Sequence, residues 1–459
     1  MNRGGRIMLI NFSISNFRSF HSTEIFSMEA GKTRNFADRT TRIASAKTLK
    51  FKAVYGSNAS GKSSLVKAFD FMQTAVIDGI PSNSVSDYCR LYEENATRPS
   101  GFEVEVALNE TIFVYGFDVL LSESRFLSEW LYEKKGSKKR LIFTRDIVSE
   151  SFDIMAFPNS SALNERLRIY ADDIKSDGTI LFLKSMNQNK DSLYTEDSKI
   201  TVFRTLYRWF RYKLSVNYPD DSITQYTYFF DSQGSTAAEE LLAKLDTGIS
   251  KVSVYDEPTE KVMAQLPKPF AQSVLDNLNE QKQRRLKDGN DEPPAVVVRS
   301  YEGHSMYLIE LHGDDVICKT LKFNHKHSNA LFTLGDESDG TIRLLDLIEV
   351  LLSNTRNMVY VIDEVNRCLH PLITKQFVRD FLDLAIERNI QLIVTTHETS
   401  LMDLKLLRQD EIGFIEKRES DGSSRIFCLE DYGARFDKSI RNAYMKGQYD
   451  AVPRIESLE

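Results

Sequence analysis

The sequence predicts an α/β fold with a mixed sheet built around a phosphate-binding loop. An apolar stretch at 49–55 precedes a glycine-containing loop at 56–63, and apolar residues at helical spacing follow at 64–75. A second apolar strand at 358–362 ends in two acidic residues. Alternating apolar residues at 102–119 predict an antiparallel hairpin next to these elements.

The loop at 56–63 fits the spacing G-x-x-x-x-G-K-[ST]. Its glycines let backbone N–H groups approach phosphate oxygens, and Lys62 can reach the β- and γ-phosphates of a nucleoside triphosphate. The Ser63 hydroxyl can bind Mg²⁺, and the positive end of the next helix faces the same anion. The residues expected to contact the nucleotide here are Gly56, Ser57, Asn58, Ala59, Ser60, Gly61, Lys62, Ser63 and Ser64.

The apolar strand at 358–362 supplies the acidic half of the predicted site. Asp363 is expected to hold Mg²⁺, directly or through water, together with Ser63. Glu364 is expected to polarise the attacking water, as general base or as its orienter. A further apolar strand at 391–395 precedes His397, which can hydrogen-bond the γ-phosphate. Glu364 and His397 are therefore the predicted catalytic residues.

The distance along the chain between these motifs predicts an insertion. Roughly 300 residues separate Lys62 from Asp363, far more than such a site needs. We expect the N-terminal part of the ATP-binding region at 1–150, a mostly helical insertion at 151–320, and the C-terminal part at 321–459.

Basic and aromatic residues interleave at 204–213, within the predicted insertion. They suit binding of nucleic acid or of a partner. They also suit an amphipathic helix with its aromatic residues in the core and its arginines in water, and this second interpretation is favoured. The residues are Arg204, Tyr207, Arg208, Trp209, Phe210, Arg211, Tyr212 and Lys213.

A turn containing Ser338 and Gly340 precedes an apolar helix at 342–350. It can be an anion-binding turn that caps the γ-phosphate bound to another subunit. It can equally be an ordinary helix start with Ser338 or Asp339 as N-cap. The residues alone do not favour either interpretation.

Composition limits the classes of protein to consider. A length of 459 residues predicts two or three structural units. The net charge of −7 gives no general argument for nucleic acid, although it allows a local basic patch. Four scattered cysteines indicate a reducing cytosol and disfavour a zinc site. No apolar run approaches the length of a membrane span, so we expect a cytoplasmic protein without membrane partners.

With these motifs the chain resembles the ABC-type AAA ATPases of bacterial abortive infection, the RloA-like and AbiL-type proteins related to the overcoming-lysogenization-defect (OLD) group. The resemblance implies an ABC/SMC-type P-loop ATPase head that uses ATP and Mg²⁺ and forms a head-to-head homodimer or higher homo-oligomer. It also implies that Ser338 and Gly340 act in trans and that Arg18 lies near the nucleotide. The matching stretches are 14–20, the phosphate loop with Asn58, 337–341, 362–364, 369–371 and 395–397.

This resemblance implies a regulator of antiphage defence that senses a phage-derived trigger and controls a separately encoded effector or toxin. The OLD group carries a fused Toprim nuclease, but only 62 residues follow His397, so we expect no nuclease in this chain. The alternative is a DNA repair or recombination ATPase related to SMC and RecF heads. A transporter ATPase is disfavoured, because the turn at Ser338 is not the transporter signature.

Overall fold

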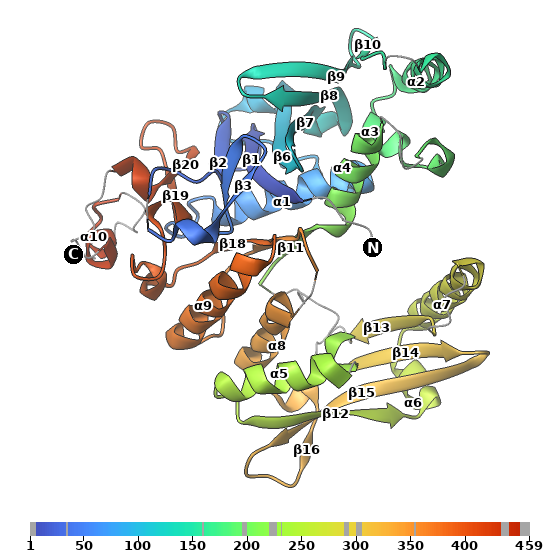
Figure 1. The fold of residues 1–459 in the computed structure, drawn as a ribbon, viewed down its shortest axis with the longest axis vertical. Coiled ribbons are helices and arrows are strands. Elements are labelled where there is room, and N and C mark those ends of the chain that lie inside the picture. The colour runs from blue at the N-terminus through green and yellow to red at the C-terminus, as the bar shows by residue number, and fades with distance from the viewer. Residues whose placement is uncertain are drawn as a thin grey trace. The chain divides into compact units, whose positions relative to one another are not determined.

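The computed structural model describes residues 6–33, 35–157, 160–194, 200–219, 227–230, 232–288, 293–299, 305–352, 355–432 and 440–449. The chain forms two compact units (Figure 1). Unit 1 comprises 1–219, 355–366 and 374–459, and unit 2 comprises 220–354 and 367–373. Among the described residues, no helix is both long enough and apolar enough to cross a membrane.

One sheet of unit 1 is antiparallel and seven-stranded. The predicted hairpin is confirmed, because the strands on either side of Asn109 pair antiparallel, from Ser100 with Val119 to Leu108 with Thr111. Along the first of these strands, alternate side chains from Ser100 to Val106 are buried, as expected for a strand with one face on the core. In spatial order the strands are β10 (Ser151–Ile154), β9 (Lys138–Asp146), β8 (Arg125–Lys135), β7 (Thr111–Leu120), β6 (Ser100–Leu108), β1 (Ile7–Ser15) and β2 (Glu24–Ser27).

The second sheet of unit 1 has six strands, five of them parallel, and it carries the predicted motifs. Its central strands are fully buried apolar runs, as expected when helices or loops cover both faces. In spatial order the strands are β11 (Leu214–Asn217), β17 (Val359–Ile362), β18 (Gln391–Thr395), β5 (Phe51–Tyr55), β19 (Ile412–Lys417) and the antiparallel β20 (Ser424–Cys428). The hairpin β3 (Thr40–Ile43)–β4 (Ala46–Leu49) forms a separate small sheet.

The main core of unit 1 contains side chains from both sheets and from helices α1 (Lys62–Ile77) and α4 (Thr201–Tyr212), with smaller contributions from two further helices. Helix α4 buries Phe203, Leu206, Trp209 and Phe210 in this core. The other helices of this unit are α2 (Ser161–Ile174), α3 (Phe182–Ser185), most of α9 (Pro371–Glu387) and α10 (Ile440–Met445). The predicted α/β class with a mixed sheet and an antiparallel β region is confirmed.

Unit 2 combines an antiparallel sheet with helices α5 (Ser232–Lys244), α6 (Thr259–Gln265), α7 (Lys268–Asp288) and α8 (Asp339–Leu352). The sheet has the order β12 (Ile249–Glu257), β15 (Asp315–His325), β14 (Met306–His312) and β13 (Ala295–Arg299), and β16 (Leu331–Phe332) pairs with β15. The segment at 151–320 therefore holds several strands besides its helices. Its first helices, α2 to α4, belong to unit 1, because their apolar faces contribute to that unit's core.

Candidate nucleotide-binding site

The phosphate loop connects the end of β5 to the start of α1, as the sequence predicts. Gly61 has φ 118°, a conformation that L-residues with side chains rarely adopt. A Cβ atom on Gly56 would lie 2.3 Å from the carbonyl oxygen of Ile415, and one on Gly61 would lie 2.5 Å from Ser424 Oγ. Both glycines are therefore required by close packing around the loop.

Lys62 is buried in this loop, with 6% of its surface exposed. Its Nζ donates hydrogen bonds to the carbonyl oxygens of Gly56 (2.9 Å) and Ser57 (3.0 Å). Burial lowers the pKa of Lys62, and the charges of Asp363 and Glu364 oppose this shift. The two predicted acids are thus close enough to Lys62 to affect its pKa.

The acids reach the loop because β17 and β18 run parallel to β5, so their carboxyl ends meet at one edge of the sheet. Asp363 is 3% exposed and accepts a hydrogen bond from Thr395 Oγ1. The backbone N–H of Glu364 donates to the same Thr395 hydroxyl (2.8 Å). Glu364 has φ 46°, a left-handed conformation held by this contact at the turn after β17.

His397 follows β18 at the same edge. Its backbone N–H donates to Asn366 Oδ1 (3.3 Å), which also accepts from Thr396 Oγ1 (2.8 Å). Surrounding protein atoms lower the pKa of His397, Lys62 lowers it further, and Glu364 and Asp363 raise it. The neutral imidazole is therefore favoured, with its charge state coupled to the other site residues.

Arg18 lies beside the start of α1. Its backbone N–H donates to the carbonyl of Asp87 (2.7 Å), and its guanidinium pairs with the Asp87 carboxylate (2.9 Å). Arg18 Nε is buried and has no hydrogen-bond partner among the described residues. Arg18, Ser64 and Lys417 line a pocket of about 310 Å³.

Several residues near the loop were not singled out by the sequence. The carbonyl of Asn217 accepts the N–H of Asp363 (2.9 Å), and the Tyr218 hydroxyl donates to Asp70 (2.9 Å) on α1. Ser424 Oγ donates to the carbonyl of Ser60. Asn217 and Tyr218 come from β11 and its end, and no local motif places that strand beside β17.

The geometry fits an anionic ligand. The hydroxyl oxygens of Ser19 and Ser60 are buried without a hydrogen-bond partner among the described residues, and the Lys62 ammonium contacts the loop carbonyls within electrostatic range of the two acids. Asn58, Ala59 and Ser63 are exposed, and Ser57 and Ser64 are half-buried.

A Mg²⁺ ion bound with a nucleotide needs only one or two protein ligands, which Ser63 and Asp363 would supply. In the described part of the chain, no group of three or more His, Cys, Asp or Glu side chains forms a metal site. The residues present therefore suit an ion that enters with phosphates rather than one held by the protein alone.

Ser338 and Gly340 belong to unit 2, whereas the residues above belong to unit 1. Ser338 Oγ accepts the N–H of Thr341 (3.2 Å), which is an N-cap contact at the start of α8. A Cβ atom on Gly340 would lie 2.7 Å from the carbonyl oxygen of Cys368, so glycine permits that segment to approach. Ser338 itself is exposed.

Comparison with solved structures shows similarity to SMC heads. An Smc head bound to the C-winged helix domain of ScpA gives a TM-score of 0.40 at 14% identity, covering 93% of this chain and 99% of that chain. A Pyrococcus furiosus Smc head domain with an extended coiled coil, bound to the C-terminal domain of ScpA, gives 0.33 at 14% identity (97% and 99% covered). The SMC head domain from Thermotoga maritima gives 0.33 at 12% (92% and 98%).

A search of curated protein sequences gives no match. A protein-family model matches residues 51–403, which include the phosphate loop, Asp363, Glu364 and His397. The chain therefore belongs to the family described as "AAA domain, putative AbiEii toxin, Type IV TA system".

Proposed function

We propose that this chain is an ATPase that binds ATP and Mg²⁺ at the phosphate loop and uses them to regulate a separate effector in bacterial antiphage defence. One observation supports this most strongly: Lys62, Asp363, Glu364 and His397 converge on one edge of the parallel sheet of unit 1, where the two acids raise the pKa of both Lys62 and His397 against the effect of burial. That convergence supplies the groups that phosphoryl transfer to water requires.

Each residue has a distinct role in the proposed reaction. Lys62 and the loop N–H groups bind the β- and γ-phosphates, and Ser63 and Asp363 hold Mg²⁺, which neutralises charge that develops on the phosphate oxygens. Glu364 accepts a proton from the attacking water or orients it. His397, kept neutral by its lowered pKa, donates a hydrogen bond to the γ-phosphate.

The proposal includes a head-to-head dimer. By the resemblance to ABC-type heads, Ser338 and Gly340 of one copy would complete the nucleotide site of another, and Arg18 would contact the nucleotide within its own copy. The exposure of Ser338 at the start of a 14-residue helix is compatible with this role. ATP binding would then close the dimer, and hydrolysis would open it.

The proposed role in defence rests on the resemblance to abortive-infection ATPases and on the family to which the chain belongs. The family's description names a toxin and a type IV toxin–antitoxin system, which supports a genetic setting with a second protein component. The alternative is a DNA repair ATPase, which predicts ATP-dependent and salt-sensitive binding to duplex DNA.

The proposed role in antiphage defence is tested by counting phage plaques on cells that express the wild-type chain with its neighbouring genes. We expect Lys62→Ala and Glu364→Gln to abolish protection, because both remove ATP turnover. Lys138→Ala, a change at an exposed lysine on β9, is the matched control and should protect like wild type. Full protection by both site variants would contradict the proposal.

Light scattering tests the dimer. With ATP and Mg²⁺, Glu364→Gln should accumulate as a dimer, and adding Ser338→Arg should return it to the monomer without loss of ATP binding. Dimerisation that is unchanged by Ser338→Arg would contradict the role in trans.

A further inference from the structure

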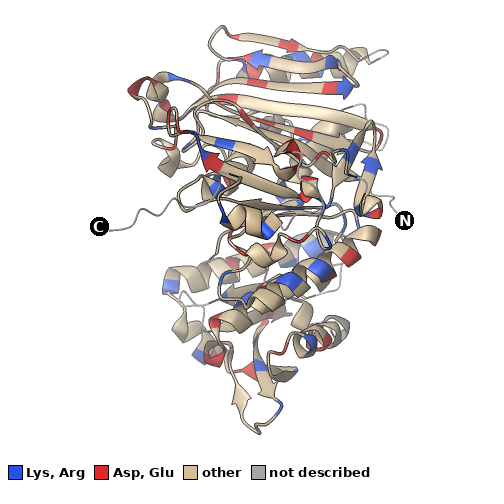
Figure 2. Ribbon diagram, turned by 90° about the vertical axis from the view of Figure 1, so that its left-hand side faces the viewer, with Lys and Arg blue, Asp and Glu red and all other residues tan. Residues whose placement is uncertain are grey.

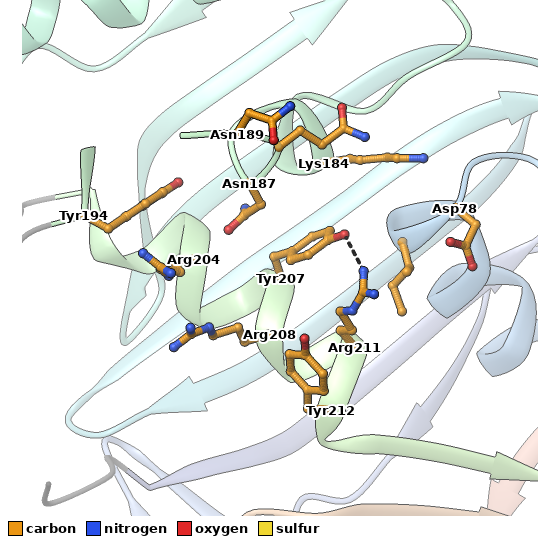
Figure 3. A pocket seen from close by; sticks show the side chains of 12 residues that line it. Asp78, Lys184, Asn187, Asn189, Tyr194, Arg204, Tyr207, Arg208, Arg211 and Tyr212 are labelled. Atoms are coloured by element: carbon orange, nitrogen blue, oxygen red, sulfur yellow. Dashed lines mark hydrogen bonds between the residues drawn. The ribbon is translucent and has the colours of Figure 1, made fainter. Parts of the chain in front are cut away.

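A second pocket, of about 720 Å³, lies in unit 1 (Figure 3). It is found at the end of α1 opposite the phosphate loop. Ile77 and Asp78 belong to its lining, whereas Lys62 begins the same helix. The helix has 16 residues, so its two ends are about 24 Å apart at 1.5 Å per residue. The pocket is therefore separate from the proposed ATP site.

Positive charge dominates this pocket. Among the described residues that line it, four are cationic, Lys184, Arg204, Arg208 and Arg211, and one, Asp78, carries a carboxylate. Over the chain as a whole the net charge is −7, and Figure 2 shows basic and acidic residues interspersed along the elements. The charge of the pocket lining is thus opposite in sign to the net charge of the chain, and it favours binding of an anion.

Aromatic rings stand among these cations. The guanidinium of Arg204 lies 5.1 Å from the ring centroid of Tyr194, and Arg211 Nη1 donates to the Tyr207 hydroxyl (3.4 Å; Figure 3). Tyr212 is 60% exposed. Tyr207 is half-buried against the core, whereas the exposed ring of Tyr212, which lies 5.7 Å from the Arg211 guanidinium, offers a flat surface on which a base can stack.

The two interpretations of the 204–213 segment apply to two different faces of α4. Phe203, Leu206, Trp209 and Phe210 are buried on one face of α4, as the amphipathic-helix interpretation requires. The residues that line the pocket occupy the remainder of the helix, and Arg208, Arg211 and Tyr212 are exposed. Core packing therefore accounts for the tryptophan and phenylalanines and in part for Tyr207, but it does not account for the exposed Arg208, Arg211 and Tyr212.

The ligand chemistry follows from this combination. Arginines recognise phosphate groups, tyrosines stack on bases, and the amides of Gln188 and Asn189, both exposed at the rim, can hydrogen-bond base edges. An acidic protein segment would use the cations but would have no need of stacking surfaces. The volume suits one or two nucleotides, since ligand pockets of roughly 300–1,000 Å³ hold molecules of that size.

We propose that the pocket formed by α4, Lys184 and the end of α1 binds single-stranded nucleic acid, with phosphates on Arg208 and Arg211 and a base on Tyr212. This binding goes beyond the proposed ATPase function and does not require ATP.

Fluorescence anisotropy with the full chain and a labelled single strand of roughly 12 nucleotides tests this, at about 50 mM salt. Wild type and Lys62→Ala should bind equally. Arg208→Glu/Arg211→Glu should bind at least about tenfold more weakly, because two phosphate contacts become repulsive. Tyr212→Ala should weaken binding about tenfold and Tyr212→Phe should restore it, because the phenylalanine ring still stacks.

Arg42→Glu/Arg441→Glu makes the same charge change at exposed arginines of unit 1 outside the pocket and should bind like wild type. Equal losses in the two double variants would overturn the proposal, as would absence of binding by wild type. If a free mononucleotide displaced the labelled strand as well as an unlabelled strand does, the pocket would be a mononucleotide site, which contradicts the proposal. If duplex bound more tightly than the single strand, the pocket would recognise a double helix, which also contradicts it. Loss of binding in Lys62→Ala would place the strand in the ATP site and would also contradict it.

Discussion

The two ends of α1 are built on different principles. At its start, Lys62 is buried, its pKa is lowered by burial, and two glycines are fixed by backbone atoms or side chains packed against them. At its end, Arg211 is exposed and its hydrogen bond with the Tyr207 hydroxyl raises its pKa. The first end is a rigid site shaped by the backbone, whereas the second is an open pocket lined by long side chains.

This difference explains why the first site has a readable motif. A backbone-built site demands glycine at fixed positions and one lysine at a fixed distance from them. A pocket built from side chains of α1, α4 and the segment at 184–194 tolerates many residue types. Substitutions should therefore act sharply at the first end and gradually at the second.

The largest expected effect is that of Gly56→Ala. Its Cβ would lie 2.3 Å from a backbone oxygen, so the loop must shift; we expect a cost of about 1–3 kcal/mol in unfolding free energy and loss of ATP binding. Gly79→Ala at the other end meets nothing closer than 3.9 Å and should cost only its backbone strain, about 1–2 kcal/mol, with ATP binding intact. Calorimetric titration with ATP and denaturant unfolding check this; normal ATP binding by Gly56→Ala would contradict the rigid-loop account.

A smaller effect is expected at Gln73, which joins α1 to α4. Its Nε2 donates to the carbonyls of Phe210 and Leu214, both at 2.7 Å. Gln73→Ala leaves these carbonyls without that donor and should cost about 1–3 kcal/mol of unfolding free energy. The exposed Gln448→Ala is the control and should change stability by less than about 0.5 kcal/mol in urea unfolding. Equal stability of the two variants would show that this link between the helices contributes nothing.

The smallest expected effect is electrostatic. Lys62 lowers the pKa of His397, so Lys62→Ala should raise that pKa, measured by NMR titration of the imidazole. Because the pKa of His397 in the folded state lies below the ordinary histidine value of 6.5, the unfolded chain binds the proton more readily, and wild type loses stability as the pH falls through 6.5 toward the folded pKa. Lys62→Ala should lose less stability than wild type over the same fall in pH. An unchanged or lower pKa would separate His397 from the Lys62 site.

Sequence patterns predicted which candidate site residues come together wherever a residue's place follows from the strand that directly precedes it. Residues 56–63 follow a buried strand, and Asp363, Glu364 and His397 follow two more, so parallel pairing brings them together. Asn217 and Tyr218 were not predicted, because β11 has only four residues and, in the described part of the chain, joins the sheet by pairing with the distant strand β17. The segment at 151–320 likewise divides between the two units according to which core buries its apolar faces, a property that local periodicity does not show.

Steady-state phosphate release, measured beside ATP binding for purified wild type, Lys62→Ala and Glu364→Gln, tests the central claim most directly. Wild type should hydrolyse ATP only with Mg²⁺, and Lys62→Ala should lose binding. Glu364→Gln should keep binding while its turnover falls about 10²–10³-fold, the usual loss when one group that acts in the transition state is removed. Turnover equal to wild type in both variants would contradict the assignment of the phosphate loop and its neighbouring acids as an ATPase site.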